Sequence, residues 1–164
     1  MKFVTLDFET YYDKEYSLSK MTTEAYIRDP RFEVILAGVK VGSSPATYFS
    51  GPMHDIGRWL AAFNLQDAMV LAHNMAFDGL ILSHHFGIHP RFLLDTLSMA
   101  RPKHAVNPGV GLAALAHHYG VGAKGDEVTV AIGKRRQDFT EEALAAFPQM
   151  SAGGADDRSE EHTS

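Results

Sequence analysis

Short apolar runs divide the chain into segments of strand length. Residues 2–8 form such a run and are predicted to be a buried strand. Residues 32–41 are apolar with several β-branched side chains, so they predict a second strand, and after a turn residues 46–49 predict a short third one. Residues 69–72 predict a fourth strand, and residues 92–97 predict either a fifth strand or the start of a helix.

Apolar residues at helical spacing predict the helices. They cover residues 53–64, 76–86, a segment around 112–116, and 141–147. Residues 11–31 are polar and aromatic, which indicates an excursion from the core. Three strands followed by alternating helices and strands predict an α/β protein with a mixed sheet and helices on both sides.

The composition narrows the class of protein. The 164 residues carry a formal net charge of −5, with 45% hydrophobic and 21% charged residues, as in a soluble globular domain. This charge argues against a basic DNA-coating protein. It does not argue against a nuclease, because metal-binding carboxylates make the charge of such an enzyme more negative. The lack of cysteine excludes disulfides and thiolate zinc sites. We find no signal peptide and no run of the ~18 apolar residues that a membrane span needs, so we expect a cytoplasmic protein.

Two acidic residues stand at the end of the first predicted strand. Asp7 and Glu9 are two positions apart, so they point to the same face of the strand. Their Cα atoms are then ~7 Å apart, close enough for both carboxylates to reach metal ions held ~4 Å from each other. A pair of solvated charges at a strand end explains the same pattern without a metal.

A third carboxylate follows the fourth predicted strand. Asn74 is a candidate N-cap, and Asp78 lies near the first turn of the next helix, where the helix dipole favours an anion. A capped helix with an early acid needs no metal. However, three carboxylates at neighbouring strand ends repel one another unless a divalent cation is bound, and Mg²⁺ or Mn²⁺ prefers such oxygen ligands.

These clusters resemble the first two exonuclease motifs of the DEDD superfamily of 3′–5′ exonucleases. Residues 6–10 match an Asp-x-Glu motif after an apolar strand. Asn74-x-x-Phe77-Asp78 resembles the second motif, Asn-x-x-x-Phe/Tyr-Asp, with one residue fewer before the aromatic side chain. Residues 94–101 are similar to the segment that follows in phage-type family A DNA polymerases, so the resemblance covers residues 1–150.

The resemblance implies a ribonuclease H-like fold with a five-stranded mixed sheet. It also implies phosphodiester hydrolysis with two Mg²⁺ or Mn²⁺ ions, in which Asp7 bridges both ions, and Glu9 and Asp78 hold one each. Asp157 is a candidate fourth ligand. We assign substrate binding to four further residues, of which two would wedge or stack near the terminal base: Leu6, Thr10, Asn74 and Phe77.

The expected substrate is a single-stranded DNA 3′ end, and the expected role is proofreading in a phage or bacterial DNA polymerase whose polymerase domain is missing from this chain. Two alternatives remain open. One is a catalytically degenerate exonuclease fold that serves as a DNA-binding or structural domain. The other is an RNA-trimming exoribonuclease of the same superfamily.

The third motif of the superfamily, Tyr-x-x-x-Asp or His-x-x-x-x-Asp, is incomplete here. Asp157 stands where its aspartate is expected, but Gly153 occupies the tyrosine position. Residues 151–164 are polar and lack an amphipathic pattern, and the last seven resemble a translated sequencing adapter. We therefore expect a disordered, non-native tail after an exonuclease domain of residues 1–150, and little activity from this chain. A natural polar tail is the alternative.

Four tyrosines follow the first motif closely: Tyr11, Tyr12, Tyr16 and Tyr26. Aromatic side chains near a nuclease site can stack on single-stranded bases. They can equally well pack the excursion of residues 11–31 against the sheet.

Overall fold

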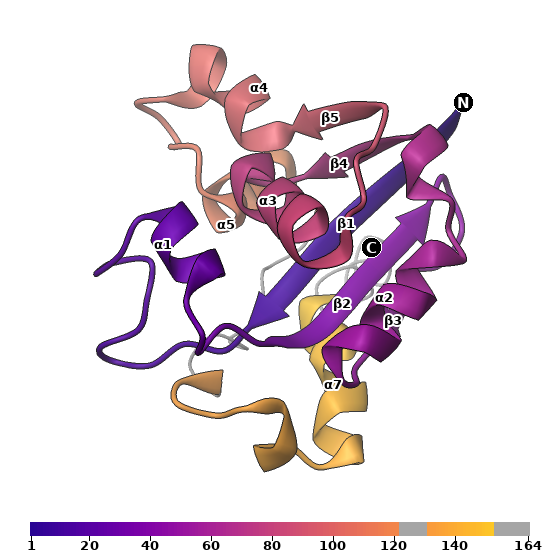
Figure 1. The fold of residues 1–164 in the computed structure, drawn as a ribbon. Helices are drawn as coiled ribbons and strands as arrows, with labels where there is room; N and C mark the ends of the chain where they lie inside the picture. Colours follow the sequence, from indigo (N-terminus) through magenta and orange to yellow (C-terminus); the bar gives the residue numbers. More distant parts are fainter. Residues whose placement is uncertain (122–130, 153–164) are drawn as a thin grey trace, which may run out of the picture.

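The structure, a computed structural model, describes residues 1–121 and 131–152. Five strands in this part of the chain form one mixed sheet, in the order β3-β2-β1-β4-β5 (Figure 1). Strand β1 is antiparallel to β2 and parallel to β4, and β4 is parallel to β5. The strand bounds are β1 Lys2–Thr10, β2 Val34–Val41, β3 Thr47–Phe49, β4 Ala68–Ala72 and β5 Phe92–Asp95. The predicted α/β fold with a five-stranded mixed sheet and helices is confirmed.

The helices of the described residues connect and cover these strands. Their bounds are α1 Thr23–Arg28, α2 Met53–Ala61, α3 Met75–Phe86, α4 Thr96–His104, α5 Leu112–Tyr119 and α7 Glu141–Ala152, with short 3-10 turns η1 Leu65–Asp67 and η2 Arg136–Asp138. Strands β1, β4 and β5 point toward the side of the molecule where α1, α4 and α5 lie (Figure 1). Ligands of open α/β sheets bind at this carboxyl edge.

The main core lies between the sheet and helices α2 and α3. Val4, Leu6 and Phe8 alternate along β1 and are buried, and they share one hydrophobic cluster with apolar residues of both helices, Ile56, Leu60, Ile81 and Leu82. Side chains of a strand alternate between faces, so Asp7 and Glu9 lie on the opposite face. The core packing therefore fixes which face of β1 presents the two acids.

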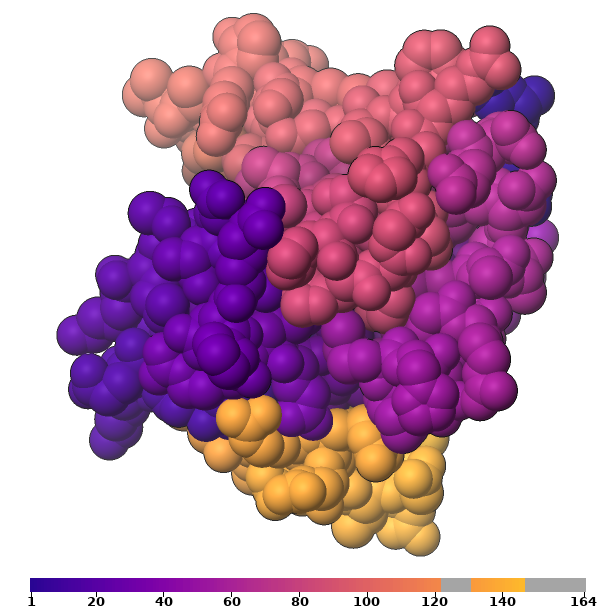
Figure 2. All heavy atoms as spheres, viewed as in Figure 1, coloured from indigo at the N-terminus to yellow at the C-terminus, as the bar shows by residue number. Residues whose placement is uncertain are grey.

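The excursion before β2 is packed by its tyrosines. Tyr16 and Tyr26 are 0% and 2% exposed, and their rings stack with centroids 4.4 Å apart. The Tyr26 hydroxyl is 2.8 Å from the Thr10 hydroxyl, which ties the excursion to the end of β1. Tyr11 is also buried. Of the two interpretations of these rings, the structure shows packing for Tyr11, Tyr16 and Tyr26. In Figure 2 the excursion forms the left side of the visible face, and the segment with η2 and the start of α7 forms its lower end.

Several boundaries differ from the sequence prediction. Residues 92–97 contain both predicted elements, because β5 ends at Asp95 and α4 begins at Thr96. Helix α4 contains Pro102, a residue that disfavours helix interiors, which hides this helix from a sequence pattern. Helix α7, predicted over residues 141–147, runs to Ala152. The division into a domain of residues 1–150 and a tail of residues 151–164 stays a prediction, because residues 153–164 lie outside the described residues. None of the helices in residues 1–121 and 131–152 is long and apolar enough to cross a bilayer.

Candidate active site

Asp78 is bonded to the backbone of β1 at the point between Asp7 and Glu9. Strand β4 pairs with β1 only as far as Thr5, and beyond this point α3, which follows β4, contacts β1. The Phe8 N–H donates to the Asp78 carboxyl at 3.2 Å, in a buried bond across 70 residues of sequence. Asp78 is 3% exposed. The fold thus places Asp78 beside the residue that separates the two acids of the first motif.

The three carboxyl groups differ in their surroundings. Asp7 is exposed, Glu9 is half-buried and Asp78 is buried. Burial raises the pKa of Asp78 well above its usual range, and the charges of Asp7 and, more weakly, Glu9 raise it further. The hydrogen bond from Phe8 opposes this shift. Without a cation, the site therefore favours a proton on Asp78.

Two tyrosines stand close to Asp7 and Glu9. Asp7 pairs with Gly38 on β2, and Gly38 pairs with Tyr48 on β3, so Asp7 and Tyr48 lie on one face. A Cβ atom at Gly38 would be 2.9 Å from Cε1 of Tyr48, so a glycine is needed for the ring to lie there. Burial and the Asp7 charge raise the pKa of Tyr48, and burial and the Glu9 charge raise the pKa of Tyr12.

Tyr48 is not among the site residues that the sequence pattern predicts. Its position beside Asp7 depends on the register of three strands, which no local pattern in the sequence reveals.

The residues expected to bind substrate differ in their exposure and in their contacts. The Leu6 side chain is 2% exposed in the core, on the face away from Asp7, so it cannot stack on a base. The hydroxyl of Thr10 is engaged by Tyr26. Phe77 is half-buried at the core margin, 6.0 Å from the Tyr26 ring, and its role in binding stays a prediction. Asp157 lies outside the described residues.

Asn74 stands at the N-cap position of α3, but it does not cap the helix with its side chain. It has left-handed backbone angles, with φ at 74°, a conformation that asparagine tolerates better than most residues. Its N–H donates to the Asp95 carboxylate at 2.9 Å. Asp95 also caps α4 by accepting from the Leu97 N–H. The turn after β4 is therefore tied to the end of β5, and this fixes the start of the helix that carries Asp78.

The donor chemistry of the three acids suits Mg²⁺ or Mn²⁺, because hard cations prefer carboxylate oxygens and would relieve the repulsion at Asp78. However, no three His, Asp or Glu side chains of the described residues are arranged as a set that could hold a metal ion. The three acids are therefore of the residue type that binds these ions, but the described residues do not form a complete set of metal ligands.

Comparison with solved structures shows which known folds this chain resembles. No protein-family model and no curated protein matches the chain. Brucella melitensis NrnC bound to pGG matches with a TM-score of 0.55 and 15% identity, over 92% of this chain and 66% of that one. Escherichia coli RNase D, described as an exoribonuclease involved in structured RNA processing, matches with a TM-score of 0.55 and 17% identity, over 92% of this chain and 36% of that one.

A third structure, Trypanosoma brucei RNase D in complex with RNA U12, matches with a TM-score of 0.58 and 14% identity, over 94% of this chain and 56% of that one. A further NrnC structure contains bound Mg²⁺. This chain spans less than two thirds of the length of these proteins. At such identities the comparison establishes the fold, and the chain has the ribonuclease H-like architecture of these nucleases.

Proposed function

We propose that this chain is the nuclease domain of a metal-dependent 3′–5′ exonuclease. The observation that carries the proposal is the buried bond from the Phe8 N–H to the Asp78 carboxyl. It brings the acid of the second motif to the backbone between the two acids of the first. Burial and the charges of Asp7 and Glu9 raise the pKa of Asp78. This supports the proposal, because a bound cation would offset the repulsion among the three acids.

Asp7, Glu9 and Asp78 are the residues that would hold two Mg²⁺ or Mn²⁺ ions. When bound, the ions would supply positive charge that favours attack by water on the phosphodiester and stabilises the departing 3′ oxygen. The chain itself fixes Asp78, because the carboxyl accepts from a strand N–H and is shielded from water. Asp7 is exposed on the opposite face from the core, where a nucleic-acid end can approach it.

RNA is the better-supported substrate class. NrnC was solved with pGG and the trypanosomal RNase D with RNA U12, and a polymerase context has no comparable support. We therefore propose trimming of single-stranded RNA 3′ ends as the main function and place proofreading of DNA second. The distinction rests on contacts with the 2′-hydroxyl, which a few side chains decide.

The test is a cleavage assay with 5′-labelled single-stranded RNA and DNA of one sequence, in Mn²⁺. We expect a ladder of products shortened from the 3′ end, with RNA cut faster. The assay uses this chain and a version extended by a native continuation that restores Tyr-x-x-x-Asp, which we expect to be the more active. Faster cleavage of DNA would reverse the substrate assignment, and no cleavage of either polymer by the extended version would overturn the proposal.

Metal binding distinguishes a catalytically degenerate domain from an active enzyme. A domain that has lost its function should not respond to Mn²⁺, whereas the proposed enzyme should be stabilised by it through mass action. Asp67→Asn is a suitable control variant, because Asp67 lies in η1 at the start of β4, away from the carboxyl edge. Its response to Mn²⁺ should equal that of the parent.

A further inference from the structure

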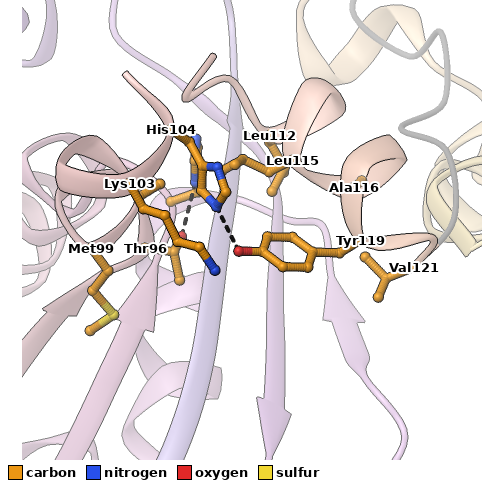
Figure 3. Close-up of a pocket in the computed structure, with 11 residues that line it drawn as sticks. Thr96, Met99, Lys103, His104, Leu112, Leu115, Ala116, Tyr119 and Val121 are labelled. Atoms are coloured by element: carbon orange, nitrogen blue, oxygen red, sulfur yellow. Dashed lines mark hydrogen bonds between the residues drawn. The ribbon is translucent and has the colours of Figure 1, made fainter. Parts of the chain in front are cut away.

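Helices α4 and α5 enclose a cavity of about 330 Å³ that the proposed chemistry does not use (Figure 3). We call it the α4–α5 pocket. It is lined by Met99, Lys103, His104, Leu112, Ala116 and Tyr119, among others, and also by His73 and Thr96. These last two residues directly follow β4 and β5. The pocket therefore opens at the same edge of the sheet as the carboxylate site.

Hydrogen bonds hold the pocket in shape. The His104 ring nitrogen Nε2 and the Tyr119 hydroxyl are 2.6 Å apart, which joins α4 to α5 (Figure 3). Nδ1 of His73 is 2.9 Å from the Thr96 hydroxyl, which joins the turn after β4 to the first residue of α4. Because His73 is five residues before Asp78, the wall of the pocket and the carboxylate site share one turn and one helix.

The rim of the pocket is apolar and exposed to solvent. Met99, Leu112, Tyr119 and Val121 are 57%, 45%, 54% and 72% exposed. Large apolar side chains that gather around a cavity mark a ligand-binding groove more often than ordinary surface. The Lys103 amine lies 5.8 Å from the centre of the Tyr119 ring, so a cation stands beside an aromatic face.

The surrounding segment is basic in an acidic chain. Residues 96–121, which include α4 and α5, contain the cations Arg101 and Lys103 and no Asp or Glu, a formal charge of +2, whereas the whole chain carries −5. Asp95, directly before this segment, is engaged by the N–H groups of Asn74 and Leu97. The segment also contains three of the nine histidines. This positive charge complements a polyanion, and an aromatic face beside a cation is the usual combination in sites for single-stranded nucleic acid.

We propose that the α4–α5 pocket holds one base of the nucleic-acid strand, upstream of the 3′ end, and that Lys103 contacts a neighbouring phosphate. The proposal rests on the proposed exonuclease function and adds a specific subsite to it. The base would stack on the apolar rim and Tyr119, while the strand continues along the carboxyl edge toward Asp7.

The first test measures binding without cleavage. Fluorescence anisotropy with a labelled single-stranded RNA of about 12 nucleotides, in the absence of divalent ions, gives the dissociation constant at several salt concentrations. Lys103→Gln should reduce the slope of log affinity against log salt by about 0.7, the value for one lost phosphate contact on a single strand. Lys2→Gln, at the opposite end of β1, is the matched control and should leave the slope unchanged.

The second test changes the RNA first and then combines this change with variants of the protein. One base at a time is removed from the probe, and we expect one upstream position at which the loss weakens binding by about 5- to 100-fold. Ala116→Trp fills the pocket and so already prevents the base from entering it. Removal of the same base from the RNA should then have no further effect on binding, because both changes remove one contact. Ala113→Trp, at an exposed position of α5 that does not line the pocket, should retain the effect.

The outcomes separate the two proposals. If the parent binds or cleaves RNA but removal of each base has an equal effect, or if Lys103→Gln and Lys2→Gln behave alike, the pocket is not a base site while the exonuclease proposal stands. If the parent neither binds nor cleaves RNA or DNA, both proposals are wrong. Because Lys103 is exposed, its variant should fold, and circular dichroism checks this.

Discussion

Asp78→Asn should stabilise the metal-free protein at neutral and basic pH. The folded protein raises the pKa of Asp78 above its value of ~3.9 in an unfolded chain. Between these two pKa values the native state binds the extra proton, so stability falls as the pH rises. The favourable contribution is complete below the unfolded pKa and is lost as the pH passes the folded pKa. Asparagine cannot ionise, and this loss should disappear in the variant.

The size of the gain follows from the surroundings of Asp78. Two unit charges ~7 Å apart repel by about 2 kcal/mol at an effective dielectric constant of about 20, and solvent reduces this value for the exposed Asp7. The variant replaces a charge-assisted bond from the Phe8 N–H by a neutral one, at a cost of about 1 kcal/mol. A net gain of about 1 kcal/mol corresponds to a rise in Tm of about 2–4 °C for a chain of this size.

The assay is thermal unfolding followed by circular dichroism, with a chelator, from pH 4 to pH 8. The difference in Tm between Asp78→Asn and the parent should grow with pH and should be largest at pH 8. Asp67→Asn should show no such trend. A variant Tm at pH 8 that is equal to or below that of the parent would refute the view that a charged Asp78 is repelled in the fold.

The same variant should lose most of its response to metal. An ion at 100 times its Kd stabilises the folded state by about 2.7 kcal/mol, which corresponds to about 5–11 °C in Tm. Millimolar Mn²⁺ should therefore raise the Tm of the parent, and it should raise that of Asp78→Asn much less. An equal rise in both proteins would remove Asp78 from the metal site.

Three further predictions concern other residues. Asp7→Ala, in the chain with a complete third motif, should reduce exonuclease activity by several orders of magnitude with an unchanged circular dichroism spectrum; retention of a tenth of the activity would contradict the two-metal assignment. Tyr26→Phe removes a buried hydroxyl that donates to the Tyr11 carbonyl and should destabilise the fold by about 1–3 kcal/mol in urea unfolding. Arg135→Met breaks the 2.7 Å contact with Glu33, and hydrogen exchange in residues 131–139 should become faster while the sheet is unaffected.

Local patterns in the sequence determined the strands, four of the helices (α2, α3, α5 and α7) and the shared face of Asp7 and Glu9. The alternation of Val4, Leu6 and Phe8 is enough for this, because a strand has a side-chain period of two and the apolar face must be buried. Helices α3 and α5 end where glycine follows, at Gly87 and Gly120, both with positive φ, as expected from a residue without a Cβ atom.

Only the tertiary structure decided the features that depend on distant segments. The bond between Phe8 and Asp78 spans 70 residues, and the position of Tyr48 beside Asp7 depends on two strand registers. The burial of Leu6 removed it from the substrate site, because its neighbours on α2 and α3 cover it. The α4–α5 pocket forms between two helices, of which one contains a proline. A sequence encodes the periodicity of each element directly, but burial, register and pKa arise from segments that meet only in the fold, and these decided the chemistry of the site.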